Sequence, residues 1–205
     1  MIRAGSDSRG PRLTSPTITV FDLEYTAWEC SMARCWLAPG EFREVVQIGA
    51  IKLDADSFAV LGEFDMLVRP RINTVLSPYF EKLTGITNEK VERQGVDFAV
   101  AYQRFLDFTA EGPIAAFGQD QRVLEDNFRL YGMGEARALP VFYDLRGWFA
   151  ALGLDPRGMH SCDLAPALGV PFAGQTHNAL HDARAVVGAM AVMASRGQCV
   201  WRPAA

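Results

Sequence analysis

Two carboxylates interrupt an apolar segment near the start of the chain. In "TITVFDLEYT" (17–26), Asp22 and Glu24 are two positions apart. Side chains alternate along a strand, so both acids would project from the same face. Neighbouring carboxylates in an apolar setting repel each other and lose hydration, and a divalent cation such as Mg²⁺ offsets both costs. The spacing therefore predicts a metal site at the end of a strand, unless the strand ends in solvent, where the two charges cost little.

A third acid and a histidine lie towards the other end of the chain. Asp182 is followed by apolar residues at i+4, i+7, i+8 and i+11, so it would begin the buried stripe of a helix. His177 precedes this helix, and a neutral histidine can accept a proton from water at pH 7. An acid is also favoured in a first helical turn by the helix dipole, and a histidine beside a capping residue, here Asn178, is often structural. These two residues alone do not define a site.

The segment "AAFGQDQRVLEDN" (115–127) supplies a fourth acid, Asp120. It follows a short apolar run and a turn at Gly118, so it would lie at the end of a sheet strand, where sites tend to form. An aspartate that only caps a helix fits the same position. Asp126 is the other candidate, but six residues of helix turn through roughly 600°, so the two acids cannot share a face. We favour Asp120 because it is nearer the strand.

Hydrophobic patterning predicts an α/β fold. Three strands in an antiparallel meander, with a long loop after the first, precede a region of helices around one further short strand. The predicted strands are 17–26, 44–54, 58–70 and 113–117, the loop is 27–42, and the predicted helices are 77–85, 97–110, 120–132, 141–153, 162–169 and 178–197. A meander followed by strand–helix alternation is typical of a mixed sheet with helices on its faces.

Composition indicates one globular domain. The 205 residues are 49% hydrophobic and 21% charged. We place the domain at 16–197, after an arm at 1–15 that is expected to be flexible and before a short tail at 198–205. The chain shows no membrane span and no signal peptide, and its four cysteines form no C-x-x-C pair, so a reduced, cytoplasmic protein is expected. The net charge of −4 argues against broad electrostatic binding of nucleic acid, but not against a small metal-assisted site.

A zinc site is an alternative use of the cysteines. It would combine Cys30, Cys35, His160 and Cys162, whose spacing matches no common zinc pattern. Partly buried thiols are therefore expected instead.

Taken in order, these motifs resemble those of the DEDDh family of DnaQ-like 3′–5′ exonucleases. "FDLEYT" resembles the first motif, "FGQDQRVL" the second and "HNALHDARA" the third. The segment "LSPYFEKLTGIT" is similar to one in the branch that includes KapD and the histone-mRNA exonuclease. The second motif departs slightly, because one residue separates Gly118 from Asp120 where the branch commonly has two. The resemblance implies an RNase H-like exonuclease fold, a mixed five-stranded sheet in which the meander continues into parallel strands.

The resemblance also implies a mechanism. In this family four acids hold two divalent cations, Mg²⁺ or Mn²⁺, and a histidine is the general base. The matching positions here are Asp22, Glu24, Asp120 and Asp182 for the metals, and His177 for the base. The implied reaction removes nucleoside 5′-monophosphates from the 3′ ends of single-stranded RNA or DNA, and the branch favours RNA.

A pocket for the last nucleotide is implied as well. The residues expected to bind substrate are Glu24, Tyr25, Leu83, Thr84 and His177. Leu83 would place apolar surface against the terminal base, and Thr84 would offer a hydroxyl to the 3′-OH. Ordinary core packing is an equally good explanation of Leu83. Trp28, Arg34, Trp36 and Arg43, in and next to the loop 27–42, could hold single-stranded substrate by stacking and charge, although a packed loop explains them more simply.

Two other functions fit the same fold. A catalytically silent nucleic-acid-binding module would usually lose an acid or the histidine, and this chain keeps all five residues. A proofreading subunit of a DNA polymerase would be expected to carry a long docking tail, whereas only "CVWRPAA" follows Gln198. The sequence gives no prediction of the oligomeric state.

Overall fold

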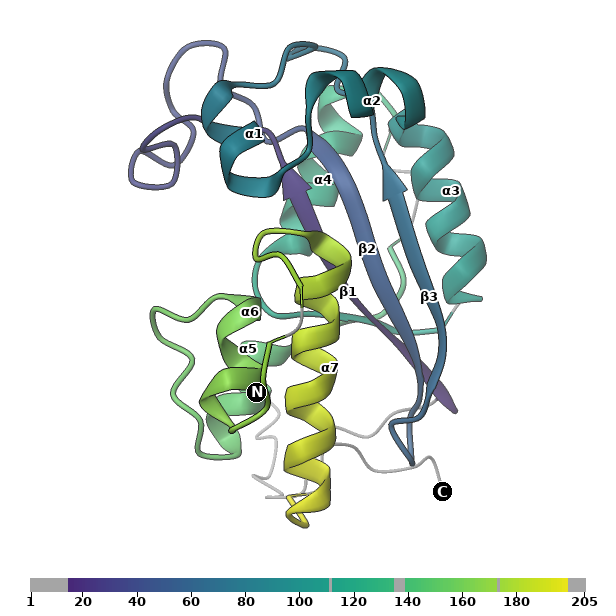
Figure 1. Cartoon of the computed structure of the whole chain (residues 1–205). Helices are drawn as coiled ribbons and strands as arrows, with labels where there is room; N and C mark the ends of the chain where they lie inside the picture. Colours follow the sequence, from purple (N-terminus) through teal and green to yellow (C-terminus); the bar gives the residue numbers. More distant parts are fainter. Residues whose placement is uncertain (1–14, 111, 135–138, 173, 199–205) are drawn as a thin grey trace, which may run out of the picture.

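The computed structural model describes residues 15–110, 112–134, 139–172 and 174–198. Within these ranges the chain forms five strands and seven helices (Figure 1). The strands are β1 (Thr17–Tyr25), β2 (Val45–Asp54), β3 (Val60–Leu67), β4 (Ile114–Ala116) and β5 (Phe142–Asp144). The helices are α1 (Pro78–Thr84), α2 (Asn88–Gln94), α3 (Phe98–Thr109), α4 (Asp120–Leu130), α5 (Leu145–Ala151), α6 (Ser161–Ala167) and α7 (Ala179–Ser195). The predicted arm at 1–15 and tail at 198–205 lie almost wholly outside the described residues.

The strands form one mixed sheet in the order β3-β2-β1-β4-β5. The first three strands make the predicted antiparallel meander, and β4 and β5 extend it in parallel from β1. Helix α7 crosses one face of the sheet, while α3 and α4 cover the other face (Figure 1). The α/β fold and the mixed five-stranded sheet are therefore confirmed.

Side chains of β1 alternate between two cores. Phe21 and Leu23 belong to the core that lies with α3 and α4. Ile18 and Val20 point the other way, into the core beneath α7. The two acids at the end of the strand continue this second row, so the alternation predicted from sequence directs both of them towards α7.

The prediction of a helix at 141–153 is wrong in its first part. Phe142–Asp144 form the edge strand β5, which pairs in parallel with β4, and α5 begins only at Leu145. The Asp144 side chain then caps α5 by accepting a hydrogen bond of 2.9 Å from the backbone N–H of Arg146. A short apolar run has no distinctive period, so the pairing with β4, and not the local sequence, determines that this segment is a strand.

Helix α2 was not predicted at all. Of its seven residues only Val91 is buried, so the segment shows no apolar periodicity. Its local signals are those of its ends, among them the Thr87 cap, whose hydroxyl accepts a hydrogen bond of 3.2 Å from the backbone N–H of Lys90. Across the described part of the chain, no helix is both long and apolar enough to span a membrane.

Candidate active site

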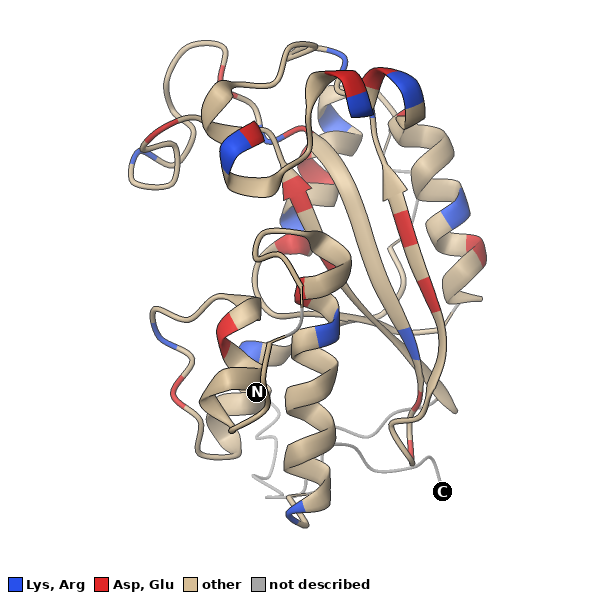
Figure 2. Ribbon diagram, in the orientation of Figure 1, with Lys and Arg blue, Asp and Glu red and all other residues tan. Residues whose placement is uncertain are grey.

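The end of β1 presents two buried acids on one face. Asp22 is 9% exposed and Glu24 7% exposed. In the β1–β2 ladder Asp22 lies opposite Gly49 and Glu24 lies opposite Gln47. The arrowhead of β1 is coloured as acidic in Figure 2. Ser161 at the start of α6 donates a hydrogen bond of 2.9 Å to Oδ1 of Asp22, which fixes the orientation of that carboxylate.

Asp120 reaches the same region from the segment that follows β4, the strand that flanks β1 on the side away from β2. It is the first residue of α4, and the turn before it needs Gly118, whose φ of +146° strongly favours glycine. A hydrogen bond from the backbone of Leu23 and the positive charge of Arg146 both stabilise its ionised form. Asp126, the alternative acid of this helix, pairs instead with Arg43. The choice of Asp120 thus agrees with where the two side chains lie.

Asp182 and His177 are placed by the first turn of α7. Asn178 caps the helix, since its side chain accepts a hydrogen bond of 3.2 Å from the backbone N–H of His181. Asp182, only 4% exposed, points inward as the apolar stripe predicted. His177 is half-buried and has a φ of +57°, a left-handed conformation that is uncommon for a residue with a side chain.

Strand β2 fixes how closely this turn approaches the sheet. A Cβ atom on Gly49 would lie 2.1 Å from the backbone nitrogen of Leu180 and 2.2 Å from the carbonyl carbon of Ala179. The side-chain oxygen of Gln47 accepts a hydrogen bond of 3.0 Å from the backbone N–H of Ala179, and its amide nitrogen donates one of 2.7 Å to Asp65. The glycine therefore permits the contact and the glutamine anchors it.

These elements bring five predicted residues into one cavity of about 410 Å³. Its lining includes Asp22, Glu24, Asp120, His177 and Asp182. Ligand atoms of Glu24, His177 and Asp182 all lie within 4.8 Å of one another. Oδ1 of Asp182 is buried and, among the described residues, has no hydrogen-bond partner. Buried oxygen ligands with an unpaired atom are what a hard divalent cation requires, so the residues present fit such an ion.

The electrostatics of the cavity support the same conclusion. Burial, followed by repulsion from the neighbouring acids, raises the pKa of Asp22 and of Glu24 well above their ordinary values. Burial also raises the pKa of Asp120 to about 6 and that of Asp182 to about 7. The pKa of His177 is lowered by burial and by the nearby His160. In the absence of a cation, the cavity therefore favours protonated acids and a neutral histidine.

Among the described residues, none of the cysteines belongs to a group of side chains close enough to hold a metal ion. Cys30 and Cys35 are exposed and Cys162 is buried, while Cys199 lies outside the described residues. Burial raises the pKa of the Cys162 thiol to about 11, so it stays protonated at neutral pH. The expectation of partly buried thiols was wrong for Cys30 and Cys35.

Comparison with known proteins identifies the family. The RNase_T family model, described as Exonuclease, matches residues 19–190. The chain belongs to this exonuclease family. It is 24% identical over 171 residues to ERI1 exoribonuclease 3 of Homo sapiens, an alignment that covers 76% of the chain and 49% of the relative. The chain thus spans about half the length of that curated relative.

Solved structures share the exonuclease fold. The nuclease domain of 3′hExo, a DEDDh family member bound to rAMP, has a TM-score of 0.78 and 21% identity, covering 93% of this chain and 97% of that one. The E. coli ExoI–ssDNA complex in its zinc-bound form has a TM-score of 0.64 and 19% identity, covering 89% of this chain and 41% of that one. DEDDh exonucleases use divalent metal ions, in agreement with the fit of the cavity to a cation.

The residues predicted to bind substrate separate into two groups. Tyr25 and Leu83 line the cavity beside the acids and the histidine. Thr84 is 1% exposed and outside the lining. Its hydroxyl donates to the carbonyl of Phe80 at 2.9 Å and accepts from the N–H of Ile86 at 3.0 Å. These bonds hold α1 and the following turn together, and they give no support to a contact between the Thr84 hydroxyl and a substrate.

Three side chains that act on the proposed catalytic residues were not predicted to lie in the cavity, although His160 was considered as a zinc ligand. Ser161 contacts Asp22, and His160 lies with its ring 5.8 Å from that of His177 in an edge-on arrangement. Arg146 on α5 lies over the ring of Phe117 at 5.3 Å, and its charge opposes the rise in the pKa of Asp120 that burial causes. The sequence around Ser161 indicated only the start of a helix, and nothing in it placed α5 or α6 beside β1.

Proposed function

We propose that the chain is a divalent-metal-dependent 3′–5′ exonuclease. It removes nucleoside 5′-monophosphates from single-stranded nucleic acid and prefers RNA to DNA. The observation that carries this proposal is the shared cavity, in which four acids and a histidine from three distant parts of the chain meet. The preference for RNA is supported by relatives named as exoribonucleases and by a structural neighbour bound to rAMP.

The cavity residues have complementary roles in this reaction. Two divalent cations, Mg²⁺ or Mn²⁺, held by Asp22, Glu24, Asp120 and Asp182 would polarise the terminal phosphodiester and lower the pKa of the attacking water. His177 accepts a proton from that water with its neutral imidazole. The water oxygen bonds to phosphorus, the P–O3′ bond to the preceding nucleotide breaks, and the released 3′-oxygen is protonated from solvent.

The polarity and chemistry of cleavage can be tested together. Matched RNA and DNA oligonucleotides labelled at the 5′ end are incubated with Mg²⁺, Mn²⁺ or chelator. We expect ladders that shorten from the 3′ end, release of nucleoside 5′-monophosphates, no reaction in chelator and faster loss of RNA. Asp182→Asn should abolish the ladder, whereas Asp126→Asn should leave it because Asp126 pairs with Arg43 away from the cavity lining. Normal activity of Asp182→Asn would refute the proposal.

The role of His177 needs a separate measurement, because its ring lies close enough to Glu24 and Asp182 to join a metal site. His177→Ala should lower the rate about 100-fold or more, as expected for loss of a general base, while Mn²⁺ affinity is kept. Loss of Mn²⁺ affinity would instead make His177 a ligand. If the wild-type protein binds single-stranded nucleic acid but releases no nucleotide with Mg²⁺ or Mn²⁺, it is a catalytically silent nucleic-acid-binding module and not an exonuclease.

A further inference from the structure

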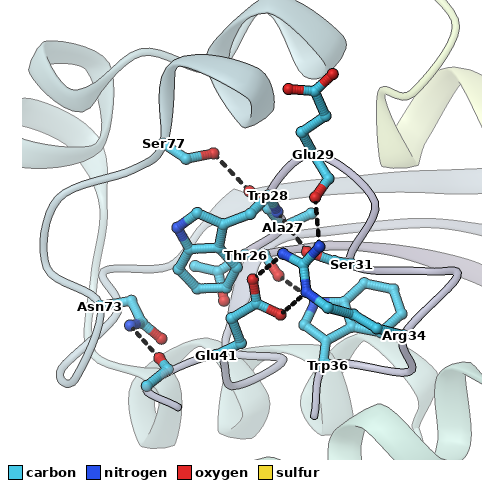
Figure 3. Close-up of polar contacts among 11 residues, drawn as sticks. Thr26, Ala27, Trp28, Glu29, Ser31, Arg34, Trp36, Glu41, Asn73 and Ser77 are labelled. Atoms are coloured by element: carbon cyan, nitrogen blue, oxygen red, sulfur yellow. Dashed lines mark hydrogen bonds and ion pairs between the residues drawn. The ribbon is translucent and has the colours of Figure 1, made fainter. Parts of the chain in front are cut away.

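The loop between β1 and β2 forms one wall of the cavity. Trp28, Met32 and Trp36 from this loop line the same space as the acids. Polar contacts hold the loop in place (Figure 3). Ser77, the cap of α1, donates a hydrogen bond of 2.5 Å to the carbonyl of Ala27, and Asn73 donates one of 2.9 Å to the carbonyl of Gly40. The wall is therefore tied at both ends to the segment that leads into α1.

Most of the loop residues that could hold substrate are already engaged. Arg34 makes a forked ion pair with Glu41 and donates a hydrogen bond of 2.7 Å to the carbonyl of Glu29 (Figure 3). Arg43 pairs with Asp126 and lies over the Trp36 ring at 5.8 Å. Because both arginines make these internal contacts, neither is available to bind single-stranded nucleic acid.

Trp36 is engaged as well. Its indole N–H donates a hydrogen bond of 2.9 Å to the carbonyl of Thr26, and its ring packs 5.5 Å from that of Tyr25. Its backbone is held at a φ of +55°, a strained conformation that persists only when the surroundings enforce it. Trp36 is thus a fixed support for the wall.

Trp28 differs from these neighbours. Its backbone is held, since its N–H donates a hydrogen bond of 2.6 Å to the hydroxyl of Ser31. Its indole, however, has neither a ring partner nor a hydrogen bond among the described residues, although it lines the cavity and is half-buried. No dashed contact reaches the indole nitrogen in Figure 3. The indole of Trp28 therefore offers a large aromatic face to a ligand, on a backbone held by Ser31.

We propose that Trp28 stacks against a nucleobase of the single-stranded substrate, next to the terminal nucleotide. This inference rests on the proposed function and names the part of the substrate that the loop recognises. The terminal nucleotide would occupy the space between the acids and Leu83, and Trp28 follows the end of β1 by three residues on the same cavity wall. A base has an aromatic face whatever its identity, so this contact selects unpaired strands rather than a sequence.

The test compares substrates with one and with several nucleosides. The p-nitrophenyl ester of a nucleoside 5′-monophosphate has no second base, whereas a short oligonucleotide does. Stacking on an aromatic side chain is worth about 1–3 kcal/mol per base, so Trp28→Ala should raise KM for the oligonucleotide about tenfold or more. The kcat/KM for the ester should stay within twofold of the wild type. Trp28→Phe should restore most of the oligonucleotide affinity.

A matched control lies in the same loop. Leu37 is 83% exposed and does not line the cavity, so Leu37→Ala should leave both substrates unaffected. Binding is measured separately, by fluorescence polarisation with Mn²⁺ and a labelled oligonucleotide whose 3′-terminal linkages resist hydrolysis. Trp28→Ala should weaken this binding about tenfold.

Failure of this inference is distinguishable from failure of the proposed function. Equal affinity of Trp28→Ala and wild type for the resistant oligonucleotide would overturn the stacking contact, whether or not the wild type is an exonuclease. An equal loss on the ester and on the oligonucleotide would also overturn it, because Trp28 would then only support the shape of the site. If the wild type hydrolyses neither substrate, the proposed exonuclease function is refuted. The binding measurement then still decides whether Trp28 stacks against a base.

Discussion

Gly49→Ala should disable the site without touching any of its proposed catalytic residues. The added Cβ would lie 2.1 Å from the backbone nitrogen of Leu180, and ordinary contact begins at 3.4 Å, so the first turn of α7 must retreat by about 1.3 Å. Backbone atoms cannot rotate away as a side chain can. The turn carries Asp182 and follows His177, so both would move away from the acids of β1. Misplacement by about 1 Å costs on the order of 100-fold in rate.

The assay is hydrolysis of a single-stranded oligonucleotide at saturating Mn²⁺, together with urea unfolding. We expect kcat to fall about 100-fold and the free energy of unfolding to fall by about 1–3 kcal/mol, the usual range for overpacking. Gly62→Ala in β3 is a matched control, because its Cβ would meet a ring atom of Phe108 at 3.4 Å. Gly188→Ala in α7 is a second control, because its Cβ would have open space.

The refuting result is clear. A folded Gly49→Ala protein with kcat within threefold of the wild type would show that the position of α7 does not limit the reaction. A similar loss in Gly62→Ala would show that any added methyl group in the sheet is harmful. Either outcome would remove the argument that a close approach at Gly49 sets the geometry of the site.

Three further predictions concern support of the acids and their protonation. Ser161→Ala removes the hydrogen bond to Asp22 and should weaken Mn²⁺ binding about tenfold in a calorimetric titration, since such supporting contacts are worth roughly 10–100-fold. Gln47→Met leaves the buried N–H of Ala179 unpaired and should lower the free energy of unfolding by about 1–3 kcal/mol in urea; an unchanged value would show that water replaces the glutamine. The metal-free protein should lose stability as pH rises from about 4 to about 8. The folded-state pKa values of Asp120, about 6, and Asp182, about 7, lie above the ordinary 3.8, so the folded state retains protons that the unfolded state has released. Urea titrations in chelator at pH 5 and pH 8 check this sign, and Mn²⁺ should recover more stability at pH 8.

The positions of the four acids in the cavity could be predicted from sequence because each acid has a local signal, whereas His177 shows no periodicity and depended on the family resemblance. A two-residue spacing on a strand directs Asp22 and Glu24 to one face, and the apolar stripe after Asp182 directs it inward. Asp120 required only its place after a short apolar strand and a glycine turn. Periodicity is a property of neighbouring residues, so a sequence contains it in full.

The supporting residues could not be found in this way, because their roles depend on contacts between distant segments. Ser161 and Asp22 are 139 residues apart, and Gln47 and Ala179 are 132 residues apart. The strand β5 is another example, since only its pairing with β4 distinguishes it from the start of α5. The sequence likewise offered four candidates for substrate contact without separating them, namely Trp28, Arg34, Trp36 and Arg43. Only the folded loop shows which of these side chains are already engaged.

The balance of charge in the cavity bears on how an acidic chain could perform the proposed reaction on an anionic substrate. Four buried carboxylates line it, and among the described lining residues only Arg146 carries a permanent positive charge. For Asp120 alone, the raised pKa corresponds to an energetic cost of about 3 kcal/mol once the acid is ionised at neutral pH. Under the proposed function, two divalent cations bound there would offset this cost and reverse the sign of the local charge, so a phosphodiester would be attracted only after the metals are in place. The burial that makes the ionised acids unfavourable would thus couple metal binding to substrate binding.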